Sequence, residues 1–200
     1  MNSRCPIAGI ILSAGASRRM GTPKALLRLE GETFLDRLIR LFSAHANPIV
    51  VVLGSHADQI RTGIERASLV QFVANPDPDR GMLSSLQCGL AAAPGAEAVM
   101  FTPVDHPDVD AATLTKIVQR FQATRAPVVI PEHQGQHGHP VLVAQPLIAE
   151  LLALPAAAQA SDVIHRYRSE TAYVAVDDPA VTADIDDPAA YAQLLSRPRP

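Results

Sequence analysis

Apolar and polar positions along the chain follow two alternating patterns. Short unbroken apolar runs are typical of strands that are buried on both faces of a parallel sheet. Stretches with an apolar residue at every third or fourth position are typical of amphipathic helices. The first pattern predicts strands at residues 7–12, 48–54, 69–73, 97–103, 127–131, 139–143 and 171–176. The second predicts helices at residues 33–46, 57–67, 82–93, 110–123, 147–154 and 189–196, with a short helix within 161–168.

One helix start carries a clear local signal. Thr33 and Asp36 resemble a capping box with Asp in place of the usual Glu, which predicts that a helix begins at this point. Its core-facing residues should be Phe34, Leu35, Leu38, Ile39 and Phe42.

The alternation of strands and helices predicts an α/β fold with three layers. A mostly parallel, Rossmann-like sheet should lie between helices on both of its faces. The 200 residues are enough for one domain with a substantial core. We expect residues 1–200 to form a single domain in which residues 197–200 are a disordered tail. The alanine-rich residues 155–161 fit either a loop or a helix.

Composition and charge exclude several classes of protein. The net charge of −3 provides no basic field for a nucleic acid, so we expect no such partner. No apolar run approaches the ~20 residues that span a bilayer, and residues 1–6 do not resemble a signal peptide. Cys5 and Cys88 are too few for a disulfide framework or a four-ligand zinc site. We expect both to be reduced thiols in a cytoplasmic protein.

A loop of small and basic residues follows the first predicted strand, at residues 12–24, with the sequence LSAGASRRMGTPK. Gly15 and Gly21 can take positive φ at little cost, and exposed N–H groups in such a loop bind anions. Arg19 and Lys24 add positive charge. The loop matches neither G-x-x-x-x-G-K-[ST] nor G-x-G-x-x-G. It predicts a phosphate-binding site at the carboxyl end of the first strand, where open α/β sheets bind their ligands.

Carboxylates follow the fourth strand and precede the last helix. Asp105 comes after the strand at 97–103, where it could be a turn or cap residue or a ligand of Mg²⁺, which prefers oxygen. Asp184 and Asp186 would share one face of an extended segment. Carboxylates at a helix start could simply favour the helix dipole.

Other polar groups give weaker signals. Gly81 to Leu86 opens a predicted helix, and free N–H groups at a helix start suit polar or anionic ligands, although Ser84 and Ser85 could be mere caps. His133, His137 and His139 are weak evidence for zinc, because no pattern of cysteines or carboxylates accompanies them.

Five motifs in this order resemble one enzyme family. They are L-x-A-G-x-S-x-R-M-G-x-x-K at 12–24, G-M-x-x-S-L at 81–86, D-x-P at 105–107, G-H-P at 138–140 and D-I-D-x-P at 184–188. Together they resemble the molybdenum cofactor cytidylyltransferases of the MobA-like NTP transferase superfamily, over nearly the whole chain. The resemblance implies a sheet of the nucleotide-diphospho-sugar transferase type.

The resemblance also implies roles for individual residues. The implied catalytic residues are Arg19, Lys24 and Asp105. The implied nucleotide-binding residues are Leu12, Ser13, Ala14, Gly15, Lys24, Asn75, Gly81 and Ser85. Mg²⁺ would be held by Asp105 and Asp184, with Asp186 as the alternative to Asp184, and the acceptor would lie beside His106 and His139.

The implied reaction is Mg²⁺-dependent transfer of CMP from CTP to a phosphorylated acceptor, with release of pyrophosphate. The implied acceptor is molybdopterin or the molybdenum cofactor, and a molybdoenzyme or its chaperone would be a transient partner. Relatives that transfer GMP have a glycine at the position of Ala14 and lack the Met82 and Ser85 pattern, so these residues favour cytidine.

The chain departs from the family pattern on the acceptor side. The family's Gly-Asp-x-Gly-Ala-Arg stretch is replaced at residues 155–163, and His106 stands in place of a glutamine. Ser13 replaces a common alanine. Two alternatives therefore stay open. One is a nucleotidyltransferase for a sugar or polyol phosphate, and the other is a non-catalytic carrier of a nucleotide or cofactor.

Overall fold

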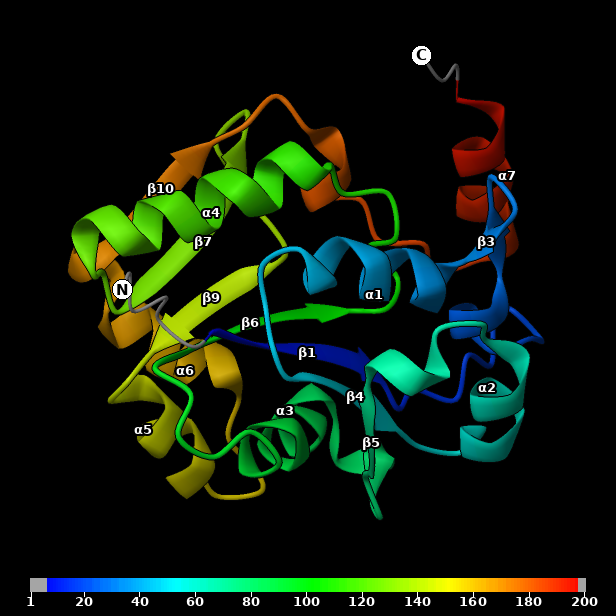
Figure 1. Cartoon of the computed structure of the whole chain (residues 1–200), viewed down its shortest axis with the longest axis horizontal. Helices are drawn as coiled ribbons and strands as arrows, with labels where there is room; N and C mark the ends of the chain where they lie inside the picture. The colour runs from blue at the N-terminus through cyan, green and yellow to red at the C-terminus, as the bar shows by residue number, and fades with distance from the viewer. Residues whose placement is uncertain (1–6, 198–200) are drawn as a thin grey trace.

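A central mixed sheet runs through the computed structural model, which describes residues 7–197 (Figure 1). Within these residues the sheet has eight strands in the order β10-β7-β9-β6-β1-β4-β5, and β8 pairs with β7. Their bounds are β1 Ile7–Ser13, β4 Ile49–Leu53, β5 Gln71–Ala74, β6 Ala98–Pro103, β7 Val128–His133, β8 Gln136–His137, β9 Val141–Ala144 and β10 Thr171–Ala175. The predicted tail residues 198–200, residues 1–6 and therefore Cys5 lie outside the described part of the chain.

The expectation of a mostly parallel sheet is confirmed. β1 pairs in parallel with both β4 and β6, β4 with β5, and β7 with β10. β9 instead runs antiparallel to β6 and β7. The connection from β7 to β9 is too short for a crossover helix, because it turns back at Gln134 and Gly135, which both have positive φ. The apolar pattern predicted this strand but carried no information about its direction.

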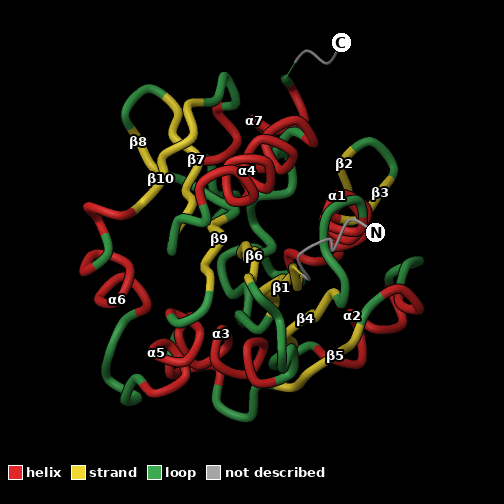
Figure 2. The backbone as a smooth tube through the Cα atoms, turned by 60° about the vertical axis from the view of Figure 1, so that its left-hand side comes forward, coloured by secondary structure: helices red, strands yellow, loops and turns green. Residues whose placement is uncertain are grey.

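Helices cover both faces of the sheet, as expected from the alternating pattern (Figures 1 and 2). One face packs against α1 (Phe34–Ser43), α2 (Ala57–Gly63), α4 (Ala111–Thr124) and α7 (Pro188–Ser196). The other packs against α3 (Met82–Ala91), α5 (Leu147–Ala153) and α6 (Ala160–Arg166). Side chains of β1 alternate between the two faces, with Ile11 in the first core and Ile10 and Leu12 in the second. None of the helices within residues 7–197 has the length and apolar character needed to cross a membrane.

Some element bounds differ from the predicted ones. The second helix was predicted to end near residue 67, but α2 ends at Gly63. A Cβ at Gly63 would lie 2.8 Å from the Leu26 side chain. A 3₁₀ turn, Ala67–Leu69, follows, so the next strand begins at Gln71. The segment that fitted either a loop or a helix is a loop up to Gln159.

A small antiparallel hairpin, β2 (Arg28–Leu29) and β3 (Glu32–Thr33), precedes α1. The turn at its tip has positive φ at Glu30 and Gly31. Tyr191 of α7 packs edge-on against Phe34, with ring centroids 5.8 Å apart, which ties the last helix to this region.

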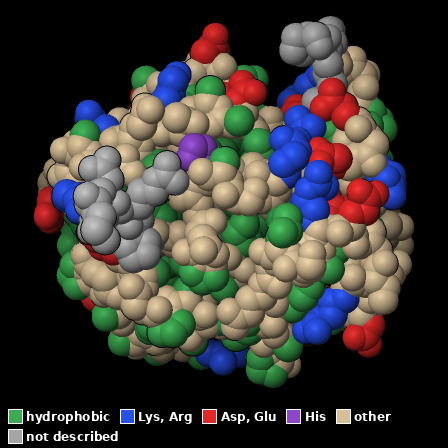
Figure 3. All heavy atoms as spheres, viewed as in Figure 1, with side chains coloured by type: hydrophobic (Ala, Val, Ile, Leu, Met, Phe, Trp, Pro, Cys, Tyr) green, Lys and Arg blue, Asp and Glu red, His purple; other side chains and the backbone are tan. Residues whose placement is uncertain are grey.

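Charged side chains of both signs are interspersed around α1, α7 and the hairpin (Figure 3). Arg37 pairs with Glu30 and Asp108, and Arg40 pairs with Glu32. Arg37 also donates to the Pro107 carbonyl at 3.0 Å, which connects α1 to the loop that carries Asp105. This surface is therefore a set of ion pairs and provides no field of one sign.

The predicted start of α1 is confirmed, and its carboxylate does more than cap the helix. The Thr33 hydroxyl accepts from the N–H of Asp36 and donates to the Asp36 carboxylate at 2.6 Å. The same carboxylate, in a residue only 1% exposed, accepts from the N–H groups of Glu65 and Arg66. Asp36 therefore joins α1 to the end of α2.

We expect Asp36→Ala to destabilise the fold, because it leaves the partly buried N–H groups of Glu65 and Arg66 without their acceptor. The free energy of unfolding should fall by roughly 2–3 kcal/mol, as measured by urea denaturation. Arg40→Ala is the control, since an exposed ion pair contributes at most about 1 kcal/mol. Equal effects of the two changes would contradict the role given to Asp36.

Candidate active site

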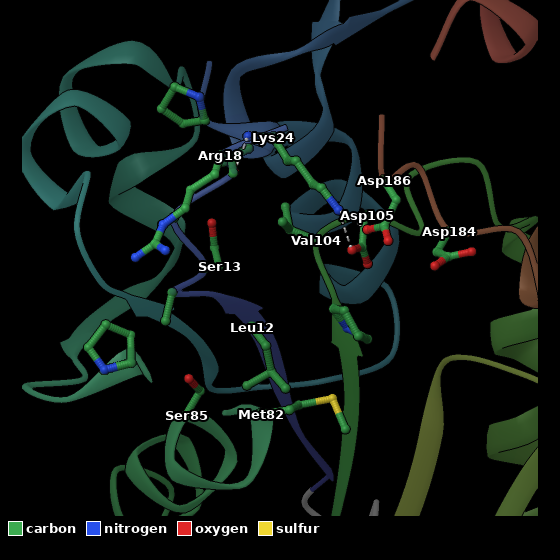
Figure 4. Close-up of a pocket in the computed structure, with 18 of the residues that line it drawn as sticks. Leu12, Ser13, Arg18, Lys24, Met82, Ser85, Val104, Asp105, Asp184 and Asp186 are labelled. Atoms are coloured by element: carbon green, nitrogen blue, oxygen red, sulfur yellow. Dashed lines mark hydrogen bonds and ion pairs between the residues drawn. The ribbon is translucent and has the colours of Figure 1, made fainter. Parts of the chain in front are cut away.

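A cleft of about 620 Å³ opens at the carboxyl ends of β1 and β6. It lies between the loop at residues 14–23, the start of α3, the loop after β6 and the segment that leads to α7 (Figure 4). The predicted site residues that line it are Leu12, Ser13, Ala14, Gly15, Arg19, Lys24, Gly81, Ser85, Asp105, His106 and Asp184. Asn75 and His139 are not among its lining residues.

The loop after β1 is held by its own hydrogen bonds. The Ser17 hydroxyl accepts from the N–H of Lys24 at 3.1 Å, and the Ser17 carbonyl accepts from the N–H of Met20 at 3.0 Å. Ser17 and Gly21 have positive φ, whereas Gly15 does not. The loop is therefore folded back on itself at Ser17, which the sequence did not signal.

Ala14 is fixed by close contact with the next strand. A Cβ at Gly54, directly after β4, would lie 2.2 Å from the Ala14 carbonyl oxygen. Only glycine allows this approach. The methyl group of Ala14 thereby has a defined place at the base of the cleft.

Lys24 lies between two carboxylates. Its Nζ atom is 2.8 Å from Asp105 Oδ2 and 2.5 Å from Asp186 Oδ1. Arg19 Nη2 lies 2.7 Å from Asp186 Oδ2. The Lys24 side chain is 12% exposed, so these ion pairs are partly shielded from water.

The ion pairs change the pKa values of the groups that form them. Burial lowers the pKa of Lys24, but its hydrogen bonds to Asp105 and Asp186 outweigh burial and raise the pKa above its ordinary value. The hydrogen bond from Lys24 lowers the pKa of Asp186. Both shifts favour the charged forms of these side chains.

Of the two aspartates before α7, Asp186 faces Asp105. The N–H of Ile185 donates to the Asp105 carbonyl at 3.0 Å, which brings the whole segment beside the loop after β6. Asp186 points toward Lys24, whereas Asp184 lies at the outer side of the cleft (Figure 4). Both aspartates line the cleft, but Asp186 is the one that pairs with the lysine.

The start of α3 forms the opposite wall. Asn75 follows β5 and donates to the hydroxyls of Ser84 and Ser85 at 2.9 and 3.0 Å. Its side-chain carbonyl accepts from the N–H of Asp77. Asn75 is thus buried behind the wall and positions Ser85, which does line the cleft.

His106 and His139 pack against each other with ring centroids 4.9 Å apart. Nε2 of His106 lies 3.9 Å from Asp105 Oδ1. The Nδ1 atom of His139 is buried and has no hydrogen-bond partner within residues 7–197. Burial and the neighbouring His106 lower the pKa of His139 to about 4, against the opposing influence of Asp105. His139 is therefore a neutral residue behind the cleft at neutral pH.

The other two histidines that were considered as zinc ligands, His133 and His137, are not lining residues of the cleft. Nδ1 of His133 is 3.0 Å from the Val176 carbonyl, and the His137 ring stacks on Tyr173. Within residues 7–197 there is no group of three or more His, Cys, Asp or Glu side chains that could hold a metal ion by itself.

One arginine of the cleft was not singled out from the sequence. Arg18 extends over Ser13 on the side of Ser85 (Figure 4), and its Nη2 atom lies 4.0 Å from Asp79 Oδ1. The sequence did show two adjacent arginines, Arg18 and Arg19, in the basic loop. Sequence alone did not show that adjacent arginines turn to different walls.

The cleft and its motifs lie in a chain that matches a known family. The model of the MobA-like NTP transferase domain matches residues 9–172. The chain belongs to the MobA-like NTP transferase family. The resemblance to this family is thereby confirmed, with four of the five motifs inside the matched residues, and the chain is a nucleotidyltransferase, as its named homologues are.

Relatives within the MobA-like NTP transferase family differ in the nucleotide that they are named for. A molybdenum cofactor guanylyltransferase of Sinorhizobium fredii is 30% identical over 90% of the chain and 81% of its own length. A molybdenum cofactor cytidylyltransferase of Escherichia coli is 25% identical over 90% of both. The match to the family therefore leaves the choice of nucleotide open.

Solved structures share the architecture. Rv0371c of Mycobacterium tuberculosis has a TM-score of 0.82 and 28% identity, covering 98% of this chain and 100% of its own. A structure of Rv0371c in complex with manganese has a TM-score of 0.78 and 26% identity, covering 96% and 100%. The expected three-layer nucleotidyltransferase fold is confirmed.

The lowered pKa of His139 predicts a pH-dependent stability. The unfolded chain takes up a proton on this residue near pH 6.5, whereas the folded chain does so near pH 4. The contribution of neutral His139 to the free energy of unfolding is therefore complete above pH 6.5 and decreases as the pH falls toward 4. Between pH 7 and 5 the loss should be about 1–2 kcal/mol, allowing for partial exposure.

His139→Gln should reduce this pH dependence, as measured by urea denaturation at pH 7 and pH 5. His133→Gln is the control, because that residue lies away from the His106 and His139 pair. A pH dependence that is the same in all three proteins would contradict the assignment.

Proposed function

We propose that this MobA-like NTP transferase moves CMP from CTP to the phosphate of a molybdopterin-type acceptor, with Mg²⁺ as its metal. The observation that carries the proposal is the group of Lys24, Asp105 and Asp186 at the end of the loop at residues 14–23. It combines an anion-binding loop with two carboxylates that suit a hard cation, in one cleft.

The chemistry needs no nucleophile from the protein. A phosphate oxygen of the acceptor attacks the α-phosphorus of the triphosphate, the bond from that phosphorus to the bridging oxygen breaks, and pyrophosphate leaves. Catalysis then consists of positioning and charge stabilisation. Arg19 and Lys24 would neutralise the triphosphate, and N–H groups of the loop would bind its oxygens.

The residues present fit a divalent metal. Mg²⁺ is commonly held by one or two carboxylates together with substrate phosphates, and Asp105 and Asp186 provide two such groups in the cleft. We propose Asp186 in place of the expected Asp184, because Asp186 faces Asp105 across Lys24. The metal would supply charge stabilisation at the phosphates. The existence of a manganese complex of Rv0371c is consistent with a divalent ion as the cofactor.

The preference for cytidine rests on the base of the cleft. Ala14 is 4% exposed and held against Gly54, so its methyl group cannot easily move aside for a purine. Ser85 lies in the opposite wall, where its hydroxyl would contact the base. The name of the Escherichia coli relative is consistent with CTP.

The acceptor would bind on the histidine side. His106 lines the cleft next to Asp105, and His139 supports it from behind. The names of both relatives favour a molybdenum cofactor as the acceptor. The altered residues at 155–163 are not among the lining residues of the cleft, so they do not weaken the nucleotide side. A molybdoenzyme as a later partner remains a prediction.

CTP with Mg²⁺ should raise the melting temperature more than GTP at the same concentration, because ligands stabilise by their affinity for the folded state. Release of pyrophosphate with a molybdopterin acceptor should be correspondingly faster with CTP. Ala14→Gly is the matched variant, and it should narrow the difference between the two nucleotides. Stronger stabilisation by GTP would refute the cytidine preference, and saturable binding without pyrophosphate release would indicate a carrier.

The three aspartates should differ in their effect on turnover. Asp105→Asn should lower kcat on the order of 10²-fold or more, since it removes charge next to the transferred phosphoryl group. Asp186→Asn should lower kcat about 10–100-fold, with partial recovery at high Mg²⁺, and Asp184→Asn only about fivefold or less. A Mg²⁺ titration of turnover measures all three. A larger loss of kcat for Asp184→Asn than for Asp186→Asn would indicate that Asp184 is the second metal ligand.

A further inference from the structure

Lys24 already occupies the carboxylates that the proposed metal needs. Its Nζ atom lies within hydrogen-bond distance of Asp105 Oδ2 and Asp186 Oδ1. The second oxygen of Asp186 accepts from Arg19. Both carboxylates are thus paired with cations of the same chain.

The charges within this group balance. Two carboxylates face one ammonium and one guanidinium group, so the four side chains are neutral as a set. The side chains of Asp105 and Asp186 are 20% and 35% exposed, so water screens their charges only in part. A dication added to this set would leave two uncompensated positive charges in a half-buried cleft.

The backbone around the group is fixed, so only side chains need to move. The N–H of Lys24 is bound to the Ser17 hydroxyl, and the N–H of Ile185 is bound to the Asp105 carbonyl. Lys24 also begins a 3₁₀ turn, Lys24–Leu26, and Ile185 is 3% exposed. The lysine side chain is long and has several rotatable bonds, so its amine could leave the carboxylates for the loop at residues 14–23 without movement of the backbone.

A triphosphate would give the Lys24 and Arg19 side chains an alternative anionic partner. Its oxygens can accept from Lys24 and Arg19, and its charge offsets that of the dication. The carboxylates then become available to the metal. A metal ion alone must instead compete with the Lys24 amine for both aspartates.

We propose that Lys24 blocks Asp105 and Asp186 against divalent cations until a triphosphate takes its amine, so that metal and nucleotide bind as a pair. The inference rests on the proposed function in one respect, namely that these two aspartates hold the metal. By linkage, the factor by which the triphosphate improves metal affinity equals the factor by which the metal improves triphosphate affinity.

The test uses Mn²⁺ alone, without any nucleotide. Free Mn²⁺ is measured by electron paramagnetic resonance during titration of the parent protein, Lys24→Met and Lys24→Gln. Removal of the competing amine should tighten Mn²⁺ binding on the order of tenfold in both variants, within the usual range of coupling between sites. Lys24→Gln keeps hydrogen-bonding capacity without charge, so it preserves the test if Lys24→Met does not fold.

Two controls separate competition from a change in net charge. Lys116→Met alters the chain's other lysine, an exposed residue of α4, and should leave Mn²⁺ affinity within about twofold of the parent. Lys24→Arg keeps a cation between the carboxylates and should also bind Mn²⁺ weakly. Melting temperatures without metal establish that each variant is folded.

The outcomes are distinct. An unchanged or weaker Mn²⁺ affinity in folded Lys24→Met and Lys24→Gln overturns the inference, as does an equal gain in Lys116→Met. Turnover plays no part in this measurement. Failure to transfer CMP would therefore contradict the proposed function while leaving the Mn²⁺ result to decide the role of Lys24.

Discussion

Two half-buried carboxylates, one after a central strand and one before the last helix, must be neutralised, and the site depends on how this is done. Lys24 accomplishes it by lying between Asp105 and Asp186, with Arg19 at the outer oxygen. Charges in a cleft interact more strongly than charges in water. The same four side chains thus link three segments that are distant in the sequence, namely the first loop, the loop after β6 and the segment before α7.

The position of these segments follows from the parallel strands. β1 and β6 are neighbours and run in the same direction, so the loops after both strands emerge at one edge of the sheet. β6 lies in the middle of the described sheet, which gives Asp105 a rigid support. Hydrogen bonds from Ile185 and contacts of Arg37 with the Pro107 carbonyl then fix the surrounding loops.

Local patterns in the sequence predicted much of this arrangement. Apolar runs located the strands, Thr33 and Asp36 located the start of α1, and a dense motif indicated the first loop. What the sequence could not supply depends on contacts over long distances. The antiparallel direction of β9 is set by a short connection, and the pairing of Lys24 with Asp186 is a contact between residues far apart in the sequence. Asn75 was predicted to bind the nucleotide; it does not line the cleft, and its amide donates to Ser84 and Ser85.

The reversed strand β9 brings a loop that precedes a strand to the edge of the sheet where the cleft opens. Val141, at the start of β9, is paired with Phe101 near the end of β6, so the residues before β9 share an edge with the residues after β6. The cleft is lined by loops that follow strands, by the start of α3 and by the segment before α7, whereas the loop that carries His139 contacts His106 from behind. A change in the length or composition of the β7–β9 connection would therefore alter the packing behind His106 while the loop at residues 14–23 stays unchanged.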